Sequence, residues 1–219
     1  MVTFETIRKN ETIRTYIVGA DQSLAALGYT EHSFPHVTRV ATVAADILSQ
    51  LGYDERMIEL AKIAGFLHDI GNLVNRHNHS QSGAIMAFSL LFDMGMPANE
   101  IGIVVSAIGN HDEGTGVAVN AVAAALILAD KTDVRRTRVR NRDMVSYDIH
   151  DRVNDSVTAS NLEINAEKTE ILLSLSVDTA ISPVVDYFEI FLERMIMCRK
   201  AAKTLGLVFR LQINGQNMM

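Results

Sequence analysis

Cysteine is nearly absent from this chain, which has one, Cys198, among its 219 residues. An internal disulfide and a zinc site built from several cysteines are therefore excluded. Long apolar runs are absent too, since the longest, Ala121–Ala129, falls far short of the about 20 residues that cross a bilayer. Glu5 and Glu11 lie where a secretory signal would be basic and then apolar. These absences predict a soluble cytoplasmic protein with no membrane partner.

Positive charge is scarce outside one stretch of the chain. The formal net charge is −6, yet six basic residues and one acid, Asp133, lie between Lys131 and Arg142 and give that stretch a net +5. The rest of the chain therefore carries −11. No extended basic face is left to follow a nucleic-acid backbone, so an extended nucleic-acid partner is not expected. A compact anionic ligand near the basic stretch is compatible with this distribution.

Apolar residues recur at helical spacing over the first two thirds of the chain. Val40, Val43, Ala44, Ile47 and Leu51, for example, fall at three- and four-residue steps, which is the period of one buried helical face. The same spacing predicts helices over residues 36–50, 54–68, 80–92, 99–110 and 118–130. The last of these is apolar almost all round and is expected to be buried.

The spacing changes after about residue 147. Leu173, Leu175 and Val177 alternate with serines, which is strand period, and residues 157–164 are expected to form the partner strand. A helix over residues 182–205 and a strand over 207–213 complete a β-β-α-β unit. The predicted fold is thus mainly α, with a helical domain at residues 1–145 and a small α+β unit at 146–219. An edge strand in that unit would allow a homodimer by edge pairing.

The chemistry is carried by histidines and aspartates at predicted helix ends. His68 and Asp69 are adjacent, and neighbouring side chains in mid-helix point about 100° apart, so one ion cannot bind both there. At a helix end before Gly71, a glycine that lets the chain turn, the two can converge. Four further residues lie at predicted helix ends, namely His36, His79, His111 and Asp130. Imidazole and carboxylate without thiolate suit Fe, Mn, Zn, Co or Ni better than Ca or Mg.

The order His36, His68-Asp69, Asp130 resembles the HD superfamily of metal-dependent phosphohydrolases, in its HDIG subtype, over roughly residues 30–140. Its dinuclear members include diadenosine-tetraphosphate hydrolases, cyclic-di-GMP phosphodiesterases and di-iron oxygenases of the myo-inositol oxygenase type. The resemblance implies an HD-domain helical bundle in which His36, His68, Asp69 and Asp130 hold one metal. Asp69 would bridge to a second metal held by His79, or His77 in its place, and His111. One or two divalent ions are expected, Fe or Mn first and Zn, Co, Ni or Mg as alternatives.

The implied reaction is hydrolysis of a phosphate ester or anhydride in a small, nucleotide-like substrate. Two ions about 3.5–4 Å apart can lower the pKa of a shared water towards 7. Many family members have a lysine where this chain has Asn72, so Arg76 or Lys131 would supply that charge. Asp69, Arg76 and Lys131 are expected to act in catalysis. Arg39, Arg76 and Lys131 are expected to bind phosphate oxygens. Asp112 or Glu113 would transfer a proton or orient a histidine. The alternatives are a di-iron oxygenase and a noncatalytic nucleotide-binding regulator.

Overall fold

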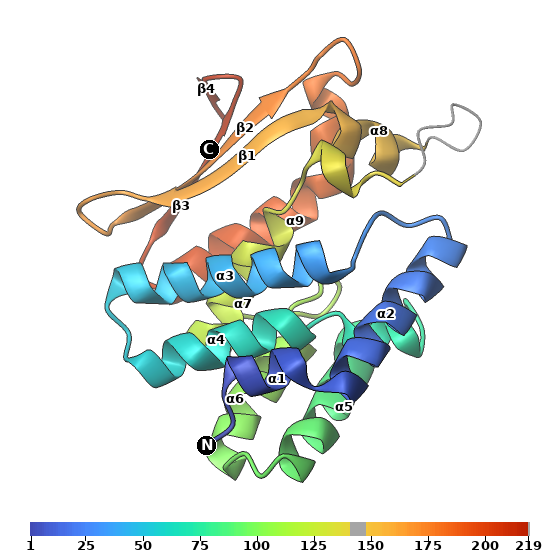
Figure 1. The fold of residues 1–219 in the computed structure, drawn as a ribbon. Coiled ribbons are helices and arrows are strands. Elements are labelled where there is room, and N and C mark those ends of the chain that lie inside the picture. Colours follow the sequence, from blue (N-terminus) through green and yellow to red (C-terminus); the bar gives the residue numbers. More distant parts are fainter. Residues whose placement is uncertain (141–147, 219) are drawn as a thin grey trace.

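The computed structural model describes residues 1–140 and 148–218. These are mainly helical with a small sheet near the C-terminus, which confirms the predicted fold class (Figure 1). The helices are α1 (Phe4–Lys9), α2 (Glu11–Ala26), α3 (Phe34–Leu51), α4 (Glu55–Leu67), α5 (His79–Asp93), α6 (Ala98–Gly109), α7 (Ala121–Lys131), α8 (Ile149–Ser156) and α9 (Val184–Thr204). Two short 3₁₀ helices are η1 (Ile70–Leu73) and η2 (Arg136–Arg138). Across the described ranges, every helix is too short or too polar to span a bilayer.

The termini of the predicted helices follow from local sequence signals. Gly52 adopts a left-handed conformation, with φ of 85°, and ends α3. Asp54 is the N-cap of α4, where its carboxylate accepts a hydrogen bond of 2.9 Å from the backbone N–H of Met57. Helix α4 then ends at Leu67, so that His68 occupies the C-cap position. The pair His68-Asp69 therefore lies at a helix end, as predicted.

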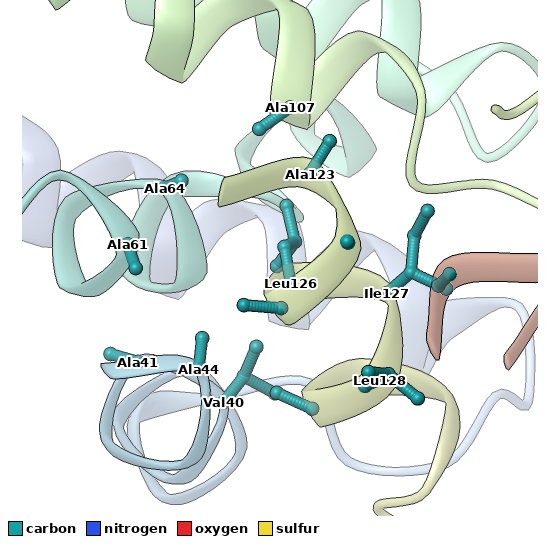
Figure 2. Packing of buried hydrophobic residues seen from close by; sticks show 14 of the residues in the cluster. Val40, Ala41, Ala44, Ala61, Ala64, Ala107, Ala123, Leu126, Ile127 and Leu128 are labelled. Carbon is teal, nitrogen blue, oxygen red and sulfur yellow. The ribbon is translucent and has the colours of Figure 1, made fainter. Parts of the chain in front are cut away.

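Helix α7 lies at the centre of the helical part (Figure 2). Residues 122–129 are all buried, which confirms the prediction from their apolar composition. Small side chains of the neighbouring helices face it, among them Ala44 of α3, Ala64 of α4 and Ala107 of α6. Because small side chains let helix axes approach closely, the polar residues at the C-terminal end of α7 reach the ends of its neighbours.

The C-terminal unit has the predicted β-β-α-β order. Strands β1 (Val157–Ile164) and β2 (Glu170–Val177) are antiparallel, α9 crosses over, and β3 (Val208–Ile213) pairs parallel to β2. A fourth strand, β4 (Gln216–Asn217), gives the sheet order β1-β2-β3-β4. Helix α9 lies between the sheet and the helical part (Figure 1), packing on β3 and on α7. The predicted boundary between residues 145 and 146 lies outside the described residues.

Candidate metal centre

Six side chains from five helix ends meet at one place in the helical part. His36 lies in the first turn of α3, His68 and Asp69 follow α4, and Asp130 lies in the last turn of α7. His79 is the first residue of α5, and His111 follows α6. The four histidines and Asp69 are buried, and the Asp130 side chain is 12% exposed. We call this set the His/Asp cluster.

Gly71 lets the start of α5 approach the cluster. A Cβ at this position would lie 2.0 Å from the carbonyl oxygen of His79 and 2.4 Å from the backbone nitrogen of Gly83. The sequence-based expectation that this glycine lets the chain turn is therefore incomplete. Its positive-φ freedom is not used, and what it provides is the close approach of two backbone segments.

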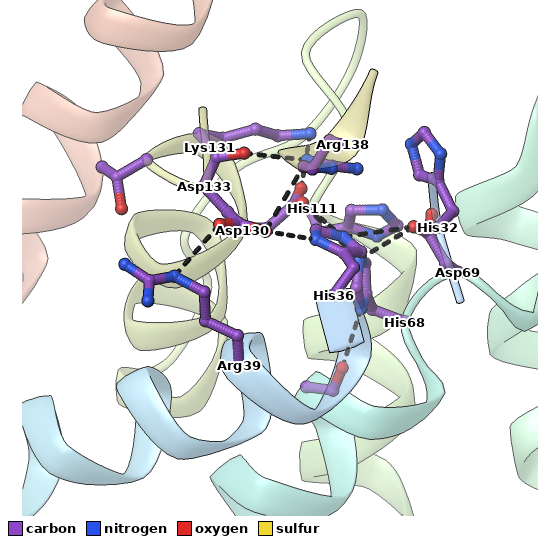
Figure 3. Close-up of polar contacts among 12 residues, drawn as sticks. His32, His36, Arg39, His68, Asp69, His111, Asp130, Lys131, Asp133 and Arg138 are labelled. Carbon is purple, nitrogen blue, oxygen red and sulfur yellow. Dashed lines mark hydrogen bonds and ion pairs between the residues drawn. The ribbon is translucent and has the colours of Figure 1, made fainter. Parts of the chain in front are cut away.

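Each histidine of the cluster is anchored through Nδ1. His36 Nδ1 lies 2.8 Å from an Asp133 carboxylate oxygen, whereas the Nδ1 atoms of His68, His79 and His111 lie 2.8, 3.1 and 2.6 Å from backbone carbonyl oxygens. A carbonyl oxygen only accepts hydrogen bonds, so Nδ1 carries the hydrogen in those three rings. In the neutral form of those three rings the lone pair is consequently on Nε2, and Figure 3 shows the rings of His36, His68 and His111 turned into the cluster.

The inward nitrogens of His36 and His68 face carboxylates without bonding to them. His36 Nε2 lies 3.5 Å from Asp69 and 3.4 Å from Asp130, and His68 Nε2 lies 3.2 and 3.5 Å from the same two carboxylates. Within the described residues, both Nε2 atoms are buried and lack a hydrogen-bond partner. Ligands bound at about 2.1 Å to one ion lie about 3.0–3.4 Å apart, so this spacing fits a metal ion at their centre.

A second group of ligand atoms lies beside the first. One set within metal-binding reach is His36, His68 and Asp130, and another is His68, Asp69 and His111. His79 Nε2 is 3.1 Å from His111 Nε2 and 3.5 Å from Asp69 Oδ1. Arg76 Nη1 lies 3.4 Å from His79 Nε2, and a cation placed against both imidazole nitrogens would remove the repulsion between their lone pairs. His77, the alternative to His79 in the sequence, is exposed and lies outside the cluster.

The electrostatic balance of the cluster favours bound positive charge. Burial raises the pKa of Asp69 and Asp130, but His68 beside Asp69 and Lys131 beside Asp130 hold both pKa values well below their usual range. Burial alone would lower the pKa of His68, yet the Asp69 and Asp130 carboxylates raise it to about 10. The two ionised carboxylates therefore stabilise a positive charge between them. That charge is either a proton on the His68 imidazole or a metal ion that replaces the proton.

The predicted phosphate-binding residues are separated by the structure. Lys131 is buried, with Nζ 2.9 Å from Asp130 and 3.2 Å from Glu113, and Arg76 lies 3.4 Å from the side-chain oxygen of Asn72. Both line a cavity of about 360 Å³ beside the His/Asp cluster. Arg39 does not line it, because its guanidinium instead pairs with Asp133 at 3.0 Å and reaches β1.

The two predicted acids next to His111, Asp112 and Glu113, differ in the direction in which their pKa is shifted. Burial raises the pKa of Asp112, and Glu113 raises it further. Glu113 ionises more readily than usual, because Lys131 and Arg194 overcome the effect of burial and lower its pKa. Neither acid is among the residues that line the cavity.

Several side chains at the site were not predicted from the sequence. Asp133 anchors His36, and Asn72 donates a 2.9 Å hydrogen bond to Asp69 Oδ1. Arg138 and Arg194 line the cavity, which is also lined by His32. Asp133 carried a usable signal, since it is the single acid in the basic stretch and follows Asp130 by one helical turn. Arg194 carried none, because it lies on α9, some 60 residues further along the chain.

Comparison with known families matches residues 34–138 to the HD domain. An uncharacterized protein of Methanocaldococcus jannaschii is 26% identical over 185 residues, covering 73% of this chain and 68% of that protein. Ribonuclease Y of Acetivibrio thermocellus is 29% identical over 147 residues, and ribonuclease Y of Opitutus terrae is 33% identical over 120. These matches cover 64% and 54% of this chain, which spans 26% and 21% of the two ribonucleases.

All six members of the His/Asp cluster fall within the matched range. The matched range, the residue order and the inward-facing ligand atoms agree with one another. Residues 34–138 of this chain therefore match the HD domain, a family whose members are generally metal-dependent phosphohydrolases.

Proposed function

We propose that this protein hydrolyses a phosphate ester or anhydride of a nucleotide-like substrate in the cavity beside the His/Asp cluster. The observation that carries the proposal is the set of four Nδ1-anchored histidines whose Nε2 atoms converge on Asp69 and Asp130. Anchoring fixes the tautomer and ring orientation that a metal site requires. Orphaned Nε2 atoms on buried rings are costly unless a cation binds them.

The residues that would hold metal are those of the cluster. His36, His68, Asp69 and Asp130 would bind one divalent ion, and Asp69, His79 and His111 a second. Fe or Mn fits this nitrogen and oxygen donor set best, with Zn, Co, Ni or Mg as alternatives. When bound, such ions supply charge stabilisation for phosphoryl oxygens and lower the pKa of water.

The chain's own cations would bind the phosphate. Lys131 is held between Asp130 and Glu113, so its ammonium keeps a fixed position at the cavity wall. Arg76 is held by Asn72 and by the ring of Tyr29, 5.5 Å from its guanidinium. Both side chains would contact nonreacting phosphate oxygens without first having to reorganise.

The two acids beside His111 would take different roles. Glu113 would orient Lys131, because its lowered pKa keeps the carboxylate charged. Asp112 is better suited to hold a proton, because burial raises its pKa, and since it lies outside the cavity lining that proton would reach the substrate only through another group. The cavity volume of about 360 Å³ suits a compact phosphorylated ligand. The name ribonuclease, given to two relatives, agrees with cleavage at phosphorus.

The test is elemental analysis of protein purified without chelator or nickel affinity resin. We expect two equivalents of Fe or Mn in the parent chain, a loss in Asp69→Ala, and one equivalent in His79→Ala. The matched control is His77→Ala, which removes an exposed histidine two residues away and leaves the metal content unchanged. Absence of metal under every loading condition would refute the proposal.

Turnover is then measured on nucleoside mono- and polyphosphates and dinucleoside polyphosphates, with oxygen uptake followed in parallel. Release of phosphate without oxygen uptake supports hydrolysis. Oxygen consumption at a metal-loaded site would instead identify a di-iron oxygenase. Nucleotide binding without turnover would identify a noncatalytic regulator.

We also propose a homodimer formed through the sheet edge. Strand β1 is the first strand in the sheet order, so one of its sides lacks a neighbouring strand among the described residues. Light scattering of the purified protein tests this, with a mass of twice 24.1 kDa expected and a single 24.1 kDa species contradicting it.

A further inference from the structure

Two arginines in the cavity have no part in the proposed reaction. Arg138 comes from η2, and Arg194 comes from α9 in the C-terminal unit. Both line the same cavity as Lys131 and the His/Asp cluster. Arg194 lies outside residues 34–138, so this part of the cavity wall is supplied by a segment beyond the HD-domain match.

The Arg138 guanidinium is buried and only partly bonded. The residue is 5% exposed, with Nε donating to the Glu31 carbonyl oxygen and Nη1 to the Asp133 carbonyl oxygen, both at 2.9 Å. Among the described residues no acceptor bonds to Nη2. Because Arg138 lines the cavity, this unused donor is available to an anionic oxygen of a ligand there.

The Arg194 guanidinium is held in place by two contacts. Its Nε lies 2.6 Å from Glu113 Oε1, and its guanidinium carbon lies 4.5 Å from the centre of the Phe191 ring. Glu113 Oε2 contacts Lys131 at 3.2 Å, so one carboxylate holds two cations side by side. Elsewhere in the described chain, no residue pairs with Nη1 or Nη2 of Arg194. Its terminal nitrogens are thus free for a ligand.

Like charges collect at this wall. Lys131, Arg138 and Arg194 line one cavity, where Glu113 contacts Lys131 and Arg194 and Asp133 lies 3.9 Å from Arg138. Carboxylates also line this cavity, namely Asp69, Asp130, Asp148 and Asp151, so its positive charge is partly balanced. Burial lowers the pKa of Arg138, the Asp133, Asp130 and Asp69 carboxylates oppose that effect, and the charge of Arg194 adds a smaller lowering. An anion between the two guanidinium groups would relieve the repulsion between them.

We infer that Arg138 and Arg194 form a second anion-binding subsite, which takes a phosphate group other than the one that is attacked. Guanidinium groups bind phosphate oxygens in bidentate geometry, and both are pre-positioned here. The substrate class is thereby a nucleotide with at least two phosphates. The second phosphate belongs either to a polyphosphate chain or to the next nucleotide of a short RNA. This inference rests on the proposed function for the position of the reacting phosphate.

The test compares the binding of a methylene-bridged nucleoside diphosphate and the matching monophosphate by titration calorimetry. We expect the parent protein to bind the diphosphate more tightly by about tenfold to hundredfold, the range for charge-assisted hydrogen bonds. Arg194→Met should abolish that preference and leave monophosphate affinity within about twofold, while Arg194→Lys retains part of it. The control is Arg210→Met, because Arg210 is an exposed β3 residue paired with Glu170 away from the cavity.

Equal losses for both ligands in Arg194→Met, or no loss for either, would overturn the inference. A thermal melt first establishes that each variant is folded, and Arg138→Lys provides a second variant that keeps the charge but loses the planar fork. A 5′-phosphorylated dinucleotide distinguishes the two sources of phosphate: tighter binding than the diphosphate, lost in Arg194→Met, identifies RNA. Repeating the titrations with chelator separates this subsite from the metal proposal, because the preference is expected to persist without metal.

Discussion

Replacing Gly71 with alanine is expected to displace His79 from the His/Asp cluster. The added Cβ would lie 2.0 Å from the His79 carbonyl oxygen, 2.4 Å from the Gly83 nitrogen and 2.6 Å from Ser82 Oγ. Ordinary contact for a Cβ begins at 3.4 Å, so the start of α5 must move away by about 1.4 Å. Metal–ligand distances tolerate only about 0.2 Å. His79 would therefore no longer reach an ion shared with Asp69 and His111.

The stability cost follows from the same contacts. Forcing one methyl group into a packed region costs about 1–3 kcal/mol, and about 2–4 °C of melting temperature corresponds to each kcal/mol in a chain of this size. The matched control is Gly102→Ala, because a Cβ at Gly102 in α6 meets nothing within 4 Å. That substitution should stabilise by about 0.4–1 kcal/mol through the unfolded chain. The same substitution, glycine to alanine, is thus expected to lower the free energy of unfolding at Gly71 and to raise it at Gly102.

Thermal melts of chelator-treated protein measure the two stabilities, and elemental analysis measures the metal content. We expect Gly71→Ala to melt about 2–12 °C lower and to hold one equivalent of metal where the parent holds two. Gly102→Ala should melt higher, with unchanged metal content. A Gly71→Ala protein with the parent's melting temperature and full metal content would refute the argument from close approach.

Three further predictions test other parts of the structure. Asp133→Asn removes the charge that anchors His36 and should weaken metal affinity by about 10–100-fold in equilibrium dialysis, and unchanged affinity would contradict that role. The raised pKa of His68, about 10, stabilises the metal-free protein fully below pH 6.5, so its melting temperature should fall as pH rises through 10. Bound metal should abolish this dependence of the melting temperature on pH. A metal-free protein whose melting temperature does not change as pH rises through 10 would contradict the raised pKa of His68. Leu126→Ala in the buried α7 should cost about 2–5 kcal/mol by urea unfolding, and a cost below 1 would place the helix nearer the surface.

The fold was predictable where one helical face carries a long apolar pattern. Helices α3 to α7 and α9 were predicted on that basis, and so were β1, β2 and β3. Helix α2 was not predicted, although its buried residues Ile13, Ile17, Ala20 and Leu24 follow the same spacing. Helix α1 has six residues with Ile7 alone buried, and α8 has eight largely polar ones. Such short segments contain too few apolar residues to show a helical spacing, and their structure depends on packing against the rest of the protein.

The candidate site was predictable as a set of residue types but not as a geometry. Predicted helix ends indicated which histidines and aspartates could meet, and the resemblance to the HD superfamily implied the grouping of His36, His68, Asp69 and Asp130 on one ion. The choice between His77 and His79 could not be made, because both precede the same helix. The structure favours His79, which is buried beside Asp69 and His111, whereas His77 is exposed. Arg39 follows His36 by about one turn, yet its side chain extends towards β1, a strand over 100 residues away in the sequence.

The basic stretch shows why charge composition alone could not assign its residues. Lys131 and Arg138 line the cavity, whereas Arg135 pairs with Asp133 at 2.7 Å and Arg140 pairs with Asp21. The difference arises from the end of α7 and the turn of η2, which direct successive side chains to different sides. The described cations of this stretch are thus divided among the cavity wall, Asp133 (the anchor of His36) and carboxylates elsewhere, such as Asp21. Because one short segment both supports the His/Asp cluster and lines the cavity of the proposed anion subsite, a substitution that loosens η2 should weaken metal binding and substrate binding together.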